Sequence, residues 1–274
     1  TVFTKFNNPE KNLSNHYEGK VLGEIWGYRV DGLFASDEEA AEYTSKINQD
    51  AVNERILTDK VDPYYRAGDL KFRDLDGDNV ISKGDDTAYD AGDREIIGNE
   101  TPRYMYSFRL GADWNGFDLG IFFQGVGKRD WYPNYLSTGF WGPYSRAFTS
   151  FIPENFMDQC WSEENRDGYF PRFRGYQTFA GSQLGVNNDR YLQDASYIRL
   201  KNLTVGYTLP VLKKVFTKLR VYFTGENLWY WSPMLKHTKY IDPEAAGGNG
   251  GLEGGQPGPP GRRGGKGHRH RPVP

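Results

Sequence analysis

Residues 104–123 read YMYSFRLGADWNGFDLGIFF, and this stretch decides the fold class. Within it, every second residue up to Trp114 is apolar, while the residues between are mostly small, polar or charged. Such alternation is typical of a β-strand whose two faces meet different surroundings. Asn115-Gly116 then supplies a dipeptide that tolerates positive φ at both central positions of a hairpin turn, and the alternation resumes at Phe117. The sequence therefore predicts a β-hairpin with long arms.

A second pair of strands is predicted further along the chain. Alternating apolar residues run through residues 203–209 and 219–229, with a short basic connector between them. The apolar residues just before Lys201 have the opposite parity, so we expect a β-bulge there. Near the N-terminus, Ser36 and the three acidic residues after it predict a capped helix that ends near Ile47.

The connections between the predicted strands differ greatly in length. Asn115-Gly116 is a two-residue turn, whereas residues 127–190 form a much longer connection. Compact domains rarely tolerate such a connection, but outer-membrane barrels alternate short periplasmic turns with long extracellular loops. We therefore expect an all-β chain that forms part of a large transmembrane antiparallel β-barrel, incomplete here. A β-sandwich shows the same alternation and stays an alternative.

Aromatic residues also crowd the ends of the predicted strands, as they do where a barrel meets the two membrane interfaces. They are Tyr104, Trp114, Phe117, Trp229 and Tyr230.

Composition narrows the classes of function. The 274 residues include 16% aromatic residues and 33 glycines, although the mean hydropathy is only −0.74. No run of about 18 apolar residues occurs, so a membrane-spanning helix is not expected. The single cysteine, Cys160, allows neither an internal disulfide nor a thiolate metal site. A formal net charge of −2 makes nucleic acid an unexpected partner.

Several sequence blocks, in one order, resemble a known family. They are GDLKFRDLDGD at 68–78, GDREIIGN at 92–99, FFQGVGKRDW at 122–131, ASYIRLKN at 195–202, GENL at 225–228 and DPE at 242–244. In order and spacing they resemble the C-terminal third of the SusC/RagA-like, TonB-dependent transporters of the bacterial outer membrane. The resemblance extends over about residues 19–244.

The resemblance implies a transporter fragment and no enzyme. Members of this family have a barrel of about 22 strands with a plug in the lumen. They act with a SusD-like surface lipoprotein and import oligosaccharides or peptides, with energy supplied through TonB by an N-terminal part that this chain is expected to lack. Residues 1–244 would then be the C-terminal portion of the barrel, in contact with outer-membrane lipid.

Residues 245–274 depart from the family pattern. They form a tail rich in glycine, proline and arginine, where the family implies a final amphipathic strand. We expect this tail to be disordered or the product of a frameshift, because it contains no alternating apolar segment. A closing strand for the barrel is therefore not expected from it.

An acidic segment has the spacing of a calcium loop. Asp74, Asp76, Asp78, Val80 and Asp85 fall at positions 1, 3, 5, 7 and 12 of an EF-hand-type loop, in which position 7 contributes a backbone carbonyl. The alternative is an acidic turn whose side chains accept hydrogen bonds from nearby backbone N–H groups. If the chain were a secreted β-sandwich, calcium and carbohydrate binding would be its expected function.

The long connection also carries candidate substrate-binding residues, Trp131, Tyr132, Trp141 and Tyr144. Aromatic side chains of this kind can stack on sugar rings, or they can pack the loop against its neighbours or a partner lipoprotein. No catalytic residue is expected, because nothing in the sequence positions the acidic residues of this loop as a pair.

Overall fold

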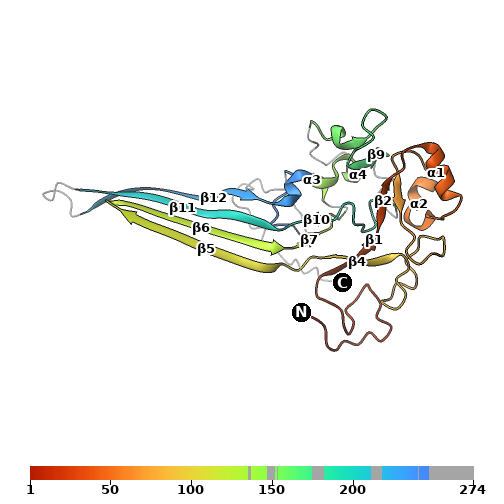
Figure 1. The fold of residues 1–274 in the computed structure, drawn as a ribbon, viewed down its shortest axis with the longest axis horizontal. Helices are drawn as coiled ribbons and strands as arrows, with labels where there is room; N and C mark the ends of the chain where they lie inside the picture. The colour runs from red at the N-terminus through yellow and green to blue at the C-terminus, as the bar shows by residue number, and fades with distance from the viewer. Residues whose placement is uncertain are drawn as a thin grey trace, which may run out of the picture.

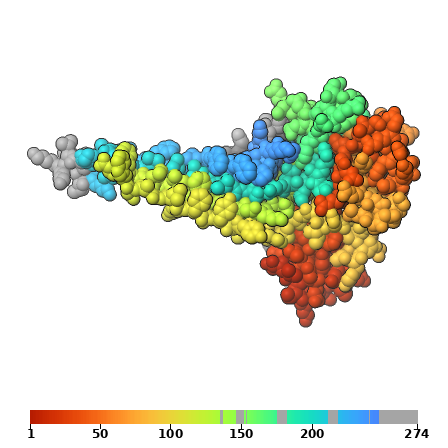
Figure 2. Space-filling model, viewed as in Figure 1, coloured from red at the N-terminus to blue at the C-terminus, as the bar shows by residue number. Residues whose placement is uncertain are grey.

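The computed structural model describes residues 1–134, 137–146, 152, 154–174, 182–210, 218–239 and 241–246. These residues form two parts, which we call the long sheet and the head (Figures 1 and 2). The long sheet consists of four extended strands and projects from one side of the head, which contains all the other described residues.

The long sheet contains both predicted strand pairs. Its strands are β5 (Arg103–Trp114), β6 (Phe117–Lys128), β11 (Tyr197–Leu209) and β12 (Leu219–Trp231). They are antiparallel and lie in the order β12-β11-β6-β5. The turn between β5 and β6 has φ angles of 47° at Asn115 and 86° at Gly116, which confirms the predicted hairpin. It lies at the end of the sheet that is far from the head (Figure 1).

The predicted bulge at Lys201 is confirmed. The register of β11 shifts between Leu200 and Asn202 against both of its neighbours, β6 and β12. The shift compensates for the change of parity in the sequence, so the apolar Leu200 and Leu203 stay on one face.

Strand β5 keeps one register with β6 from Arg103 onward, so the predicted alternation includes Tyr104. The only irregularity there is the φ of 55° at Tyr104, which causes no register shift.

The β-sandwich alternative is wrong. Every residue of β5 and all but two of β12 are exposed to solvent, so no second layer covers these strands anywhere in the described ranges. The long sheet is a single open layer, as expected for a section of a barrel wall. Among the helices of the described part, none is long and apolar enough to cross a membrane.

The head is built from short elements. Three two-stranded antiparallel sheets pair β1 (Glu24–Tyr28) with β4 (Arg94–Asn99), β2 (Val30–Leu33) with β3 (Leu70–Phe72), and β7 (Asp130–Trp131) with β10 (Gln193–Asp194). A parallel pair joins β8 (Cys160–Trp161) and β9 (Phe170–Arg172). The helical elements are α1 (Asp37–Thr44), η1 (Asp50–Val52), α2 (Glu54–Leu57), α3 (Thr138–Trp141), α4 (Pro143–Arg146), η2 (Met157–Gln159) and η4 (Pro233–Lys236).

Helix α1 starts where the sequence predicts. The Ser36 hydroxyl accepts a hydrogen bond from the Glu39 backbone N–H at 3.1 Å, which is an N-cap contact. The helix ends at Thr44, and one more i→i−4 hydrogen bond follows it, from the Ile47 backbone N–H to the Tyr43 carbonyl at 2.9 Å. The next residue, Asn48, pairs with Val80.

The head has a core rich in aromatic residues. The described residues of the long connection supply much of it, so this segment is a packed unit rather than an irregular loop. Phe140 contacts Trp141 edge-on at 4.7 Å between ring centroids, and Phe156 stacks on Phe170 at 5.1 Å. Tyr28, Val52, Leu70, Phe72 and Ile81, from the N-terminal part of the chain, belong to the same core.

The predicted tail falls largely outside the described residues, which end at Ala246. Ala245 and Ala246 belong to a turn in which both backbone N–H groups donate to the Asp242 carbonyl, at 3.0 and 3.1 Å. The division of the chain after Glu244 stays a prediction.

Candidate functional site

The long sheet has one apolar face. Residues paired in register across antiparallel strands point to the same side, so the pairing assigns each side chain to a face. Phe108, Phe123 and Leu200 form one such row, and Leu110, Ile121 and Leu203 form the next. The other apolar residues on this face are Tyr106, Ala112, Trp114, Phe117, Leu119, Ile198, Val205, Tyr207, Leu209, Leu219, Val221, Phe223, Trp229 and Trp231.

The opposite face of the same strands carries most of the polar side chains, together with a few apolar ones such as Met105 and Phe122. The Arg220 guanidinium forms an ion pair with the Asp118 carboxylate across β12, β11 and β6, at 2.5 Å. The hydroxyls of Thr204 and Thr224 lie 3.0 Å apart on paired strands. Polar groups on this side therefore satisfy one another across the sheet, and we call it the polar face.

Such a distribution does not suit a sheet in water. Leu110 is 55% exposed and Phe223 is 60% exposed, within an apolar surface that extends over all four strands. Exposed apolar patches of more than a few hundred Å² mark binding or membrane surfaces. Strands of 12 or 13 residues also exceed the about 9–11 residues that a tilted strand needs to span a bilayer.

Aromatic side chains mark both ends of the apolar face. At the hairpin end, Phe117 and Tyr207 lie 4.4 Å apart between ring centroids, next to Trp114. At the head end, Trp229 and Trp231 are about half exposed. This placement agrees with the predicted aromatic girdles for Trp114, Phe117 and Trp229, whereas Tyr230 is paired with Arg199 and lies on the opposite face.

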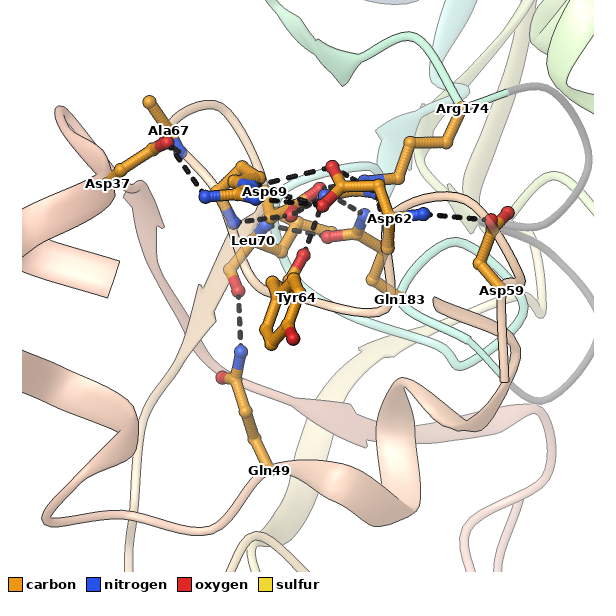
Figure 3. A network of polar contacts seen from close by, with 11 residues as sticks. Asp37, Gln49, Asp59, Asp62, Tyr64, Ala67, Asp69, Leu70, Arg174 and Gln183 are labelled. Carbon is orange, nitrogen blue, oxygen red and sulfur yellow. Dashed lines mark hydrogen bonds and ion pairs between the residues drawn. The ribbon is translucent and has the colours of Figure 1, made fainter. Parts of the chain in front are cut away.

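A buried ion pair joins the long connection to the N-terminal part of the head (Figure 3). Two nitrogens of Arg174 donate to the two carboxylate oxygens of Asp69, at 3.0 and 2.8 Å. The Asp69 side chain is fully buried, and the Arg174 side chain is 7% exposed. The pair is bidentate, which is the strongest geometry available to these groups.

Two glutamines extend this network. The Leu70 backbone N–H donates to the Gln183 side-chain oxygen at 2.6 Å, and Gln183 donates to Asp69 at 3.3 Å. Gln49 donates to the Leu70 carbonyl at 3.2 Å. Strand β3 is thus fixed from both sides by side chains that are distant in sequence, and no sequence motif pointed to them.

The acidic segment brings three of its predicted ligands together. One ligand oxygen from each of Asp74, Asp76 and Asp78 lies within 4.8 Å of the others. The same carboxylates accept hydrogen bonds from local backbone groups: Asp74 accepts from Gly77 at 2.7 Å and from Asn79 at 2.9 Å. The segment therefore also has the geometry of the acidic-turn alternative.

The remaining predicted ligands are not part of this group of three. The Val80 backbone N–H donates to Asp78 at 2.6 Å. At position 12, the Asp85 backbone N–H donates to Asp90 at 3.2 Å, and its carboxylate is outside the acidic group. The four-aspartate ligand set is thus reduced to three.

Asp93 was not singled out by the sequence, but it fixes both ends of the acidic segment. Its carboxylate accepts from the Leu75 and Ser82 backbone N–H groups, each at 2.7 Å. Burial raises the pKa of this carboxyl above its ordinary value. Asp93 lies in the block at residues 92–99 that resembles the family, and this is the only indication of its importance in the sequence.

All four candidate substrate-binding aromatics lie in or against the core of the head. Trp131, Trp141 and Tyr144 are buried, and Tyr132 is partly buried against them. The Tyr144 hydroxyl donates to the Pro171 carbonyl at 2.6 Å. Because protein atoms cover these rings, the structure favours the alternative in which they pack the loop.

Cys160 is buried in the same core. Burial raises the pKa of its thiol, which keeps it protonated and unreactive at neutral pH.

Comparison with known proteins gives related sequences. TonB-dependent receptor P3 of Formosa agariphila is 31% identical over 234 residues, which covers 83% of this chain and 19% of that protein. TonB-dependent receptor P26 of the same organism is 28% identical over 183 residues, or 65% of this chain and 16% of that protein. The chain thus spans about a fifth of the length of its curated relatives. No family model matches it.

Solved structures of similar fold include the RagAB peptide transporter, with a TM-score of 0.47 and 21% identity over 84% of this chain and 21% of that chain. The closed-closed state of the RagAB peptide importer gives a TM-score of 0.48 and 20% identity over 88% of this chain and 22% of that chain. On the similarity of its sequence to the curated receptors, the chain belongs to the TonB-dependent receptors, as a fragment of their β-barrel.

Proposed function

We propose that the long sheet is a section of the wall of an outer-membrane transporter. The apolar face contacts lipid, and the polar face lines the lumen through which the solute passes. The observation that carries this proposal is that a continuous apolar surface covers one face of a single layer of strands, while most of the polar side chains lie on the other face. In a barrel wall, one side of every strand meets lipid and the other meets the interior.

The transported solute is an oligosaccharide or a peptide, as the resemblance to the family implies. In the complete receptor a SusD-like lipoprotein meets the extracellular end, which is the end that carries the head, and TonB supplies the energy. The position of the head supports this orientation, because long loops are extracellular and the short hairpin turn is at the other end.

Spin labelling of the complete receptor tests the two faces, in a Cys160→Ala background. Nitroxide labels at Phe108, Leu119 or Ile121 should collide with lipid-soluble oxygen, because these side chains lie on the apolar face. Labels at Ser107 and Arg109 should collide with an aqueous nickel chelate. Equal access of both reagents to both sets would contradict the membrane assignment.

We also propose that the acidic segment binds calcium weakly, since it offers a cluster of three carboxylates. The expected dissociation constant is about 10⁻⁴–10⁻³ M, as in extracellular calcium modules with incomplete ligand sets. Calorimetric titration of the receptor with calcium should give heat that the variant Asp74→Ala/Asp76→Ala lacks. If the two proteins give the same heat, the segment is only an acidic turn.

A further inference from the structure

A short segment near the end of the described chain is held by basic side chains of β11. The Arg199 guanidinium forms an ion pair with Asp242 and lies 3.5 Å from a carboxylate oxygen of Glu244. The Lys201 ammonium donates to both oxygens of Glu244, at 2.9 and 2.7 Å. We call residues 241–246 the strap.

The residue between the two acids has a basic partner as well. The Arg129 guanidinium donates to the Pro243 carbonyl at 3.3 Å. The two ends of the strap, Ile241 and Ala246, are buried in the core of the head. The strap is therefore anchored in the head at both ends and held to the sheet by charge in the middle.

The register shows which face the strap covers. Arg199 is paired with Gln124 of β6 and with Tyr230 of β12, and Gln124 is paired with Ser107 of β5. These residues belong to the polar face. Arg199 is only 6% exposed, because the strap lies over it. The strap thus covers the head end of the polar face.

These contacts are weaker than the buried pair elsewhere in the head. The side chains of Asp242 and Glu244 are each more than a third exposed, whereas Asp69 is fully buried. Within the described residues, the Nε atoms of Arg129 and Arg199 donate no hydrogen bond. Ion pairs that are partly exposed and incompletely hydrogen-bonded contribute little stability and are screened by salt.

We propose that residues 241–246 are a releasable strap, which closes the head end of the polar face while Asp242 and Glu244 are paired and opens it when they separate from Arg199 and Lys201. The inference rests on the proposed function, because a gate has a purpose only where the polar face lines a transport path. It assigns to the Asp-Pro-Glu block a role in controlling access to that path.

Labelling of a thiol on the strand residue paired with Arg199 tests the proposal in outer membranes that contain the complete receptor. The reporter is Gln124→Cys in a Cys160→Ala background, and the probe is a water-soluble maleimide. Adding Lys201→Glu should speed the labelling several-fold, because the new carboxylate repels Glu244. The exchanged pair Lys201→Glu/Glu244→Lys should restore part of the slow rate, since the attraction between residues 201 and 244 returns while the new ammonium at 244 lies next to the Arg199 guanidinium.

A second variant leaves the strands unchanged. Asp242→Asn/Glu244→Gln should also speed the labelling, whereas Arg166→Glu should not, because its ion pair with Glu163 is exposed on the head. If the variants that break the ion pairs of the strap were labelled at the same rate as the receptor with an intact strap, the proposal of a releasable strap would be wrong. If only a lipid-soluble maleimide reached Gln124→Cys, the proposed function itself would be wrong, so the two failures are distinguishable.

Discussion

Arginine in place of Leu110 is expected to destabilise the complete barrel by about 2–4 kcal/mol. Leu110 lies midway along β5, in one row with Ile121 and Leu203 on the apolar face. A guanidinium at this position would have to leave water for the hydrocarbon of the bilayer. The measurement is the free energy of unfolding of the receptor in lipid vesicles, from a urea titration.

The matched control for this variant is Ser107→Arg, on the same strand but on the polar face. Two residues further along the strand, Arg109 already lies on that face, with its guanidinium 5.5 Å from the centre of the Phe122 ring. The control should therefore cost far less than Leu110→Arg. Equal costs for the two variants would show that the apolar face does not meet lipid.

Removal of the Asp69 carboxylate is expected to cost about 3–5 kcal/mol in the local stability of the head. In Asp69→Ala the buried Arg174 guanidinium loses its bidentate partner and keeps only the longer ion pair with Asp62, at 3.4 Å. The Arg66 backbone N–H and the Gln183 amide lose their acceptor as well. The Leu70 amide, which donates to Gln183, should then exchange its hydrogen at least about a hundredfold faster.

Glu163→Ala is the comparison for this measurement. It removes an ion pair with Arg166 in which both side chains are more than 60% exposed, and such pairs contribute about 0–1 kcal/mol. Exchange at Leu70 should be unchanged in this variant. A similar acceleration in both variants would mean that the buried pair does not hold the head together.

The predictions that held depend on residues close together in sequence. The Asn115-Gly116 turn, the bulge at Lys201 and the Ser36 cap each follow from backbone preferences or side-chain parity within a few residues. Helix α1 likewise keeps its local hydrogen bonds as far as Ile47, and the bridge to Val80, which is distant in sequence, starts only at Asn48.

The candidate sites were predicted less completely. The spacing of the acidic segment brought Asp74, Asp76 and Asp78 together, but it could not show that Asp93 rather than Asp85 would fix the segment. Likewise, the aromatic composition of the long connection indicated contact surfaces. It could not show whether Trp141 would face a ligand or the core, because both uses require the same side chain.

The strands, their turn, their bulge and the alternation of their faces follow from the sequence alone, because alternation is a local property of the extended backbone. Whether a second layer covers those faces depends on tertiary packing. A β-sandwich and a barrel wall share one local pattern, and they differ in whether a second layer covers the strands. The structure likewise brought Asp69 to Arg174, 105 residues further along the chain, and the strap to Arg199. Such pairings depend on how distant segments pack, which local residue preferences do not specify.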